Sequence, residues 1–181
     1  MSLASSITYI IDDNPMIREK KKQSNFTGFI ISKVINALLN KNRKLKIYKQ
    51  KIKDQSKMIF SSKKIPKISI SEYIQRIIEY TEIENSSLIM SLIYLDRICK
   101  KDIMITELNI HRFLLMSLII SIKINEDIIY DNNYYSKVAG ISIKEFNQLE
   151  SEFLKLINFK LYISEEEFLK YKFYLEHFTY K

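Results

Sequence analysis

The chain has 181 residues, of which 46% are hydrophobic and only two each are glycine and proline. This length and apolar content suit one folded domain, and the scarcity of turn residues excludes sheet-rich folds and glycine-rich phosphate-binding loops. We therefore expect an all-α protein. Its net charge of +8 is unevenly placed: residues 1–67 hold 16 of the 29 basic and 4 of the 21 acidic residues, a balance of +12, which leaves −4 for the remainder.

The residue content also argues against an internal disulfide, a signal peptide and a membrane span. Cys99 is the only cysteine, so it excludes an internal disulfide, suits a reducing compartment and is interpreted as a small buried hydrophobe. The first 15 residues lack the basic start of a signal peptide, and the longest apolar run, 113–122, is far shorter than the roughly 20 residues of a membrane span. We expect an intracellular protein, in the cytoplasm or nucleus, with no membrane partner.

The first 25 residues show no sustained period, and we expect a loosely ordered leader there. The segment FTGFIISKVINALLN that follows predicts an amphipathic helix, because its apolar residues recur at every fourth position. They are Phe26, Ile30, Val34 and Leu38. This stripe needs another element on which to dock.

A lysine-rich stretch from Lys41 to Lys64 follows, and Pro66 separates it from the main domain. The stretch either prolongs the preceding helix or forms a linker. Clustered lysines attract phosphate, but no recognisable binding motif accompanies them and lysine is abundant throughout the chain. A solvated linker is therefore favoured over a nucleic-acid-binding arm, and we assign residues 26–67 to an N-terminal helix and a basic linker.

Three capping boxes mark helix starts in the rest of the chain, each a serine that can bond the backbone N–H of a glutamate three residues later. They are Ser69 with Glu72, Ser142 with Glu145, and Ser164 with Glu167. Asn85 or Ser86, and Asn109, are weaker starts, and Gly140 suits the end of a short helix at NNYYSKVA. We predict five helices within residues 68–160 and one within 161–181. Those at 86–99 and 110–123 are apolar nearly all round and belong in the centre.

Asp96 and Arg97 stand side by side near the end of the apolar run SLIMSLIYLDRI. Adjacent side chains on a helix point about 100° apart, so these two charges cannot pair with each other and each needs its own partner. An unpaired buried charge is strongly unfavourable. Arg76, on the preceding predicted helix, suits Asp96, and we expect a structural ion pair between them.

Several motifs in this order and spacing resemble a known family. SEYIQRIIEY is followed by YLDR at residues 94–97, LNIHR at 108–112 and KVAGI at 137–141. Together they resemble the cyclin box of P/U-type cyclins over about residues 65–178. The resemblance implies a single five-helix cyclin fold with an added helix on each side, no cofactor, and a cyclin-dependent protein kinase as partner. A cyclin of this kind holds the kinase's C-helix and turns it inward.

The resemblance also implies which residues contact the kinase. Lys123 matches a lysine at the end of the third helix of the box, and Glu150, in preference to Glu152, matches a glutamate in the fifth. A pocket for an aliphatic kinase residue is expected beside them, with walls from Ile120, Leu154, Phe159 and Leu161. Without the family, Lys123 is simply a helix-end cation, and Glu150 is a solvated residue or a partner of Lys123.

The sequence departs from the pattern of the larger cyclins in two ways, and functions other than kinase activation remain open. We expect no second five-helix repeat of the larger cyclins within these 181 residues. Tyr73, Gln75 and Ile78 stand where many cell-cycle cyclins have a substrate-docking motif, which argues against docking there. His111 and His177 have no second ligand at metal spacing, so neither a metal site, nor catalysis, nor a small-molecule substrate is expected.

The alternative is a cyclin-fold transcription factor or adaptor that binds DNA or protein without activating a kinase.

Overall fold

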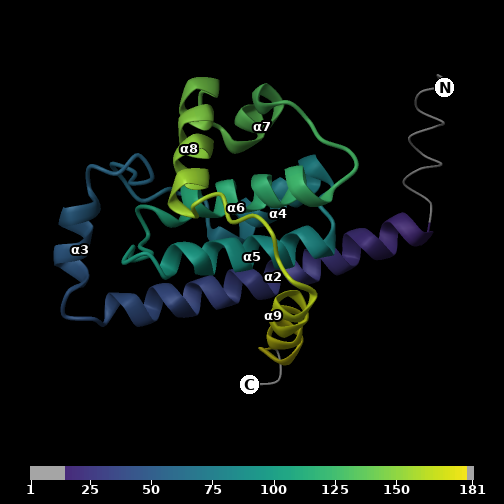
Figure 1. Ribbon diagram of the computed structural model, residues 1–181, viewed down its shortest axis with the longest axis horizontal. Coiled ribbons are helices and arrows are strands. Elements are labelled where there is room, and N and C mark those ends of the chain that lie inside the picture. The colour runs from purple at the N-terminus through teal and green to yellow at the C-terminus, as the bar shows by residue number, and fades with distance from the viewer. Residues whose placement is uncertain (1–14, 179–181) are drawn as a thin grey trace.

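The computed structural model describes residues 15–178, and within that range the chain forms eight α-helices and no strand (Figure 1). They are α2 (Pro15–Arg43), α3 (Tyr48–Gln55), α4 (Ile70–Thr81), α5 (Asn85–Cys99), α6 (Ile110–Asn125), α7 (Asn132–Ala139), α8 (Ile143–Leu156) and α9 (Glu165–Phe178). The prediction of an all-α fold is confirmed. Helices α4 to α8 are the five predicted within residues 68–160, and α9 is the one predicted after them.

Helices α5 and α6 form the centre of the bundle and pack against each other along their length (Figure 1). Every residue of α6 from Phe113 to Ser121 is buried, as are most residues of α5 from Ser87 to Ile98. Because these helices are apolar nearly all round, burial on several sides is the stable arrangement. The predicted central position of both helices is confirmed.

The amphipathic helices cover this pair from different sides. Helix α2 packs on α4 and α5, helix α8 packs on α6, and α9 contacts α5 and α2. Gly28 lies where α2 meets α4: a Cβ at this position would lie 2.7 Å from Ile78 Cδ1 and 2.8 Å from Ile74 Cγ2. The absence of a side chain at Gly28 therefore lets the two helices approach closely.

Three aromatic rings join the basic stretch to the core. Phe60 stacks on Phe113 of α6 with a ring-centroid distance of 4.1 Å and an interplanar angle of 7°, and Phe153 of α8 lies 6.3 Å from Phe60. Phe60 is only 1% exposed. The segment expected to be a solvated linker thus contributes a core residue.

The three predicted capping serines all begin helices. Ser69 and Glu72 form the complete reciprocal box at α4. Ser142 and Ser164 accept from the backbone N–H groups of Glu145 and Glu167, both at 3.2 Å. The side chains of these two glutamates pair with Arg112 and Arg97, so the last two boxes also connect helices.

The N-terminal region differs from the prediction in two ways. Helix α2 begins at Pro15, not near Phe26, so residues 15–25 of the expected leader are helical, and residues 1–14 of it lie outside the described residues. Proline is tolerated in a first turn, where its missing N–H has no helical partner. The basic stretch contains its own short helix, α3, docked by an ion pair between Lys51 and Asp102 at 2.7 Å.

The close approach of α2 and α4 gives a testable prediction. Gly28→Val should lower the free energy of unfolding by about 2 kcal/mol, because the new side chain forces the helices apart. Ala37→Val, at an exposed position of α2, should cost about 0.5 kcal/mol, the propensity difference alone. Urea unfolding monitored by circular dichroism measures both values. Equal losses would show that the approach at Gly28 has no energetic role.

Candidate functional site

Lys123 and Glu150, far apart in the sequence, form an ion pair at the end of α6. The Lys123 Nζ donates to Glu150 Oε1 and also to Asn132 Oδ1. Asn132 completes the triangle, since its Nδ2 donates to Glu150 Oε2 at 2.9 Å. The side chains of Lys123 and Glu150 remain 26% and 17% exposed, so the pair is held in place and still accessible from solvent.

Local structure explains why these three groups converge. Lys123 lies in the last turn of α6, where a cation is favoured by the helix dipole. Asp131 caps α7 by accepting from Tyr134 N at 2.7 Å, which places Asn132 in the first turn of α7. Gly140 then ends α7 in the left-handed conformation with φ 73°, and Ser142 starts α8 two residues later. The chain therefore returns with Glu150 opposite Lys123.

The predicted pocket residues lie at different depths. Phe159 is 64% exposed, whereas Leu154 and Leu161 are half-buried and pack on the core. Ile120 is only 3% exposed, so it lies beneath this surface, because α6 is covered on several sides. Its place in a pocket for a kinase side chain stays a prediction.

The backbone that carries Phe159 has an unusual conformation. Asn158 and Phe159 are both left-handed, with φ of 54° and 53°. Such a conformation costs a residue with a side chain about 1 kcal/mol or more. The turn is held by a hydrogen bond from Phe159 N to Leu154 O at 2.9 Å. It ends α8 and directs the chain toward α9.

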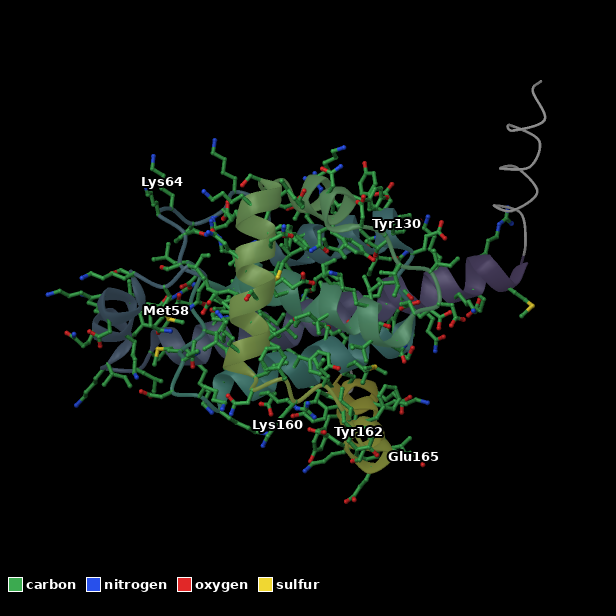
Figure 2. All side chains as sticks on the ribbon, turned by 45° about the horizontal axis from the view of Figure 1, so that its top comes forward. Met58, Lys64, Tyr130, Lys160, Tyr162 and Glu165 are labelled. Carbon is green, nitrogen blue, oxygen red and sulfur yellow. The ribbon has the colours of Figure 1, made fainter. Side chains whose placement is uncertain are left out.

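Arg97 holds the segment that follows this turn. Its guanidinium donates to the carbonyl oxygens of Lys160 and Tyr162, the latter at 3.0 Å, and to Glu167 Oε2 at 2.7 Å. The Tyr94 hydroxyl donates to Leu161 O at 2.8 Å. Two residues of the YLDR motif thus fix three successive carbonyls between α8 and α9. Figure 2 shows Lys160, Tyr162 and Glu165 along this path.

The expected ion pair between Arg76 and Asp96 is wrong. Arg76 is exposed, and Asp96 pairs with Lys100 one turn later, at 2.8 Å. Asp96 also accepts a hydrogen bond of 2.6 Å from the Tyr171 hydroxyl of α9. The Asp96 side chain is 37% exposed, so it needs no buried cation on α4. Both charges of the motif therefore serve the docking of α9, with Arg97 as the more buried of the two.

The remaining candidate reactive groups are protected. Burial, with a contribution from nearby Asp96, raises the pKa of Cys99 to about 11, so the thiol stays protonated near neutral pH. Burial lowers the pKa of His111, although its hydrogen bond to the Ile68 carbonyl opposes the shift. Within residues 15–178 no group of three or more His, Cys, Asp or Glu residues is arranged to hold a metal ion. No helix in that range is both long and apolar enough to cross a membrane.

Comparison with known families agrees with this geometry. The family model described as Cyclin matches residues 13–161, which include α4 to α8 and the whole Lys123, Asn132 and Glu150 cluster. The chain therefore belongs to the cyclin family. The matched range also includes α2 and α3, and the resemblance to P/U-type cyclins is confirmed by the relatives.

These relatives are plant and fungal cyclins. Cyclin-U4-3 of Arabidopsis thaliana is 42% identical over 113 residues, which cover 61% of this chain and 52% of that protein. PHO85 cyclin-like protein psl1 of Schizosaccharomyces pombe is 32% identical over 186 aligned positions, which cover 94% of this chain and 76% of that protein. PHO85 cyclin-7 of Saccharomyces cerevisiae is 33% identical over 162 aligned positions, which cover 78% of this chain and 57% of that protein. The chain spans about half the length of the plant relative.

Sequence reasoning missed one residue of this cyclin's candidate site, Asn132, and one structural residue at the other end of α6, Arg112. Asn132 bridges Lys123 and Glu150, and its only sequence signal is its place next to the capping residue Asp131. Arg112 donates to Glu145 Oε1 at 3.0 Å through Nε and also bonds to Ser62, so it ties α6 to α8 and to the segment before α4. Its membership of the LNIHR motif gave no indication of these partners.

The unequal roles of Asp96 and Arg97 give a second prediction. Arg97→Ala should lower the free energy of unfolding by about 2–3 kcal/mol, because two carbonyls and Glu167 lose a charged donor. Asp96→Ala should lower it by about 1 kcal/mol or less, since its ion pair is largely exposed. Hydrogen exchange should also speed up in residues 158–163 with Arg97→Ala, and less so in α6. The reverse order of stabilities would restore Asp96 as the buried charge.

Proposed function

We propose that this cyclin is the noncatalytic regulatory subunit of a cyclin-dependent protein kinase, which it binds and activates by holding the kinase's C-helix. The observation that carries the proposal is the convergence of Lys123 and Glu150 on one accessible surface of the cyclin box. The family membership supports it, and so do the relatives whose names call them PHO85 cyclins. A kinase partner would place the chain inside the cell, in the cytoplasm or the nucleus.

The polar side chains of this surface are already held in one arrangement before a partner binds. Lys123, Asn132 and Glu150 hold one another, so little side-chain freedom is lost when a partner arrives. Both charged groups retain lone pairs or protons that can bond outward. Phe159 supplies an exposed apolar side chain just after the helix that carries Glu150. Charged and apolar contacts are therefore available from one helix and the turn that ends it.

Activation would follow as a population shift. A kinase exchanges between arrangements in which its C-helix lies inward and outward, and a cyclin that contacts only the inward arrangement favours it by the difference in binding free energy. The inward arrangement is the one in which a glutamate of the C-helix pairs with the catalytic lysine. In this scheme the cyclin contributes no reactive group.

A charge swap tests the proposed surface. The double variant Lys123→Glu/Glu150→Lys keeps an ion pair within the cyclin and inverts both charges that a kinase would meet. We expect an unchanged melting temperature and loss of kinase association by at least about 100-fold, since two close charge contacts become repulsive. The measurement is a tagged pull-down from the native cell extract, with mass spectrometry and a kinase assay on the eluate.

The matched control is a charge swap confined to α8, the helix that carries Glu150. Lys155 and Glu152 form an exposed ion pair on α8 at 2.7 Å, away from Lys123. Lys155→Glu/Glu152→Lys should bind and activate the kinase as the wild type does. If the Lys123 and Glu150 swap also binds normally, the assigned surface is wrong. If the wild type brings down transcription components or nucleic acid and no kinase, the function is wrong.

A further inference from the structure

The end of the molecule formed by α3 and its flanking segments is strongly basic. Residues 41–67 contain eleven lysines and arginines, and Asp54 is the only acidic residue among them. Arg43 pairs with Glu107 and Lys51 with Asp102. The other nine basic residues are exposed lysines that form no ion pair with any residue of the range 15–178.

Helix α3 is docked by one face only. The Tyr48 hydroxyl donates to Glu107, Lys51 Nζ donates to Asp102 Oδ1 at 2.7 Å, and Gln55 is buried. Burial tends to raise the pKa of Glu107, but the hydrogen bonds from Tyr48 and Arg43 outweigh it and hold the pKa below its usual value. Glu107 therefore stays ionised and anchors the helix near neutral pH.

The opposite face of α3 carries exposed lysines that lack an ionic partner, beside Gln50 and Asp54, whose side chains bond to each other at 2.7 Å. Lys49 and Lys53 lie four residues apart on the helix, and Lys46 and Lys57 lie in the turns directly before and after it, at positions that continue the same face. Like charges one turn apart repel each other. The helix retains this arrangement because its inner face is anchored, and an anionic partner would relieve the repulsion. We call Lys46, Lys49, Lys53 and Lys57 the lysine face.

The chemistry of this face favours an acidic peptide over a nucleic acid. Arginine is the residue suited to bidentate contacts with phosphates and bases, and Arg43 is already engaged by Glu107. Bases stack on exposed aromatic rings, but Tyr48 bonds inward and Phe60 is buried. Exposed aliphatic side chains flank Lys46 instead: Leu45 and Ile47 are 42% and 53% exposed. These can contact the apolar side chains of a peptide.

The spacing of the lysines also suits an extended chain. Residues four apart on a helix are about 6 Å apart along its axis. Alternate side chains of an extended peptide point the same way and repeat about every 6.6 Å. We propose that the lysine face docks extended acidic segments, with Asp or Glu at alternate positions, of the proteins that the associated kinase phosphorylates. The substrate part of this proposal rests on the proposed function, whereas the binding of an acidic peptide does not.

The position of α3 is compatible with simultaneous kinase binding. Helix α3 lies at one end of the long axis, and α7, which carries Asn132, lies near the middle of that axis on the upper side (Figure 1). In Figure 2 the segment after α3, with Met58 and Lys64, lies far from Tyr130 beside α7. Nitrogen-tipped side chains extend outward from the end of the molecule that carries α3. A substrate segment on the lysine face would therefore leave the Lys123 and Glu150 surface free.

Direct binding is the first test. Fluorescence anisotropy measures the affinity of the purified chain for a labelled peptide in which Glu alternates with Ser. Lys49→Glu/Lys53→Glu should weaken binding about tenfold, because each reversal replaces an attraction by a repulsion. The control Lys21→Glu/Lys22→Glu makes the same charge change at exposed positions near the other end of α2 and should weaken it less than about twofold. Wild-type affinity should fall as salt is added.

Three results would overturn the proposal. Equal weakening by the two variants, with unchanged melting temperatures, would show that only the net charge of the molecule matters. A single-stranded oligonucleotide that binds more tightly than the peptide, with the same dependence on Lys49 and Lys53, would assign the face to nucleic acid. Absence of peptide binding by the wild type at low salt would also refute it.

A kinetic experiment tests the link to the kinase. With the kinase recovered in the pull-down, Lys49→Glu/Lys53→Glu should raise KM about tenfold for a substrate peptide extended by the Glu and Ser segment, and leave kcat unchanged. KM for the same peptide without the extension should not change. An unaltered KM for the extended peptide would refute substrate docking. If no kinase is recovered, the proposed function fails, and the anisotropy result still decides whether the lysine face binds acidic peptides.

Discussion

The apolar character of α5 and α6 on nearly every side is the constraint on which the rest of the structure depends. Two such helices are stable in water only when other elements cover them, and here α2, α8 and α9 do so. Charged side chains can reach solvent only where the central helices end. Arg97 lies in the last turn of α5, Arg112 at the start of α6 and Lys123 in its last turn. The polar contacts of this cyclin are therefore concentrated at the ends of its core.

These terminal charges join the covering helices to one another. Lys123 connects α6 to α7 and α8 through Asn132 and Glu150. Arg97 connects α5 to the segment between α8 and α9, and so fixes the chain just beyond the exposed Phe159. The surface that we propose for the kinase is bounded by these two sets of contacts. Its shape follows from the lengths of α5 and α6, which set where the charges emerge.

Helix order and helix starts were largely predictable because their signals are local. Ser69, Ser142 and Ser164 begin helices as predicted, and Gly140 ends one in the left-handed conformation. The partner of Asp96 was not predictable in the same way. Periodicity gives the direction of a side chain about its own helix axis, but Asp96 faces α9 and not Arg76. The core position of Phe60 was missed because a single aromatic residue in a lysine-rich stretch carries no period.

The sequence by itself determined the all-α class, the two central helices and the placement of Lys123 at a helix end, because hydrophobic periodicity and capping depend on residues within a few positions of one another. The tertiary structure alone decided that Lys123 meets Glu150 and Asn132, that Ile120 lies beneath the surface, and that Arg97 holds residues 160–162. Each of these contacts is made between different elements of the fold. Such contacts depend on the crossing angles and separations of packed helices, which the shapes of all the buried side chains set together.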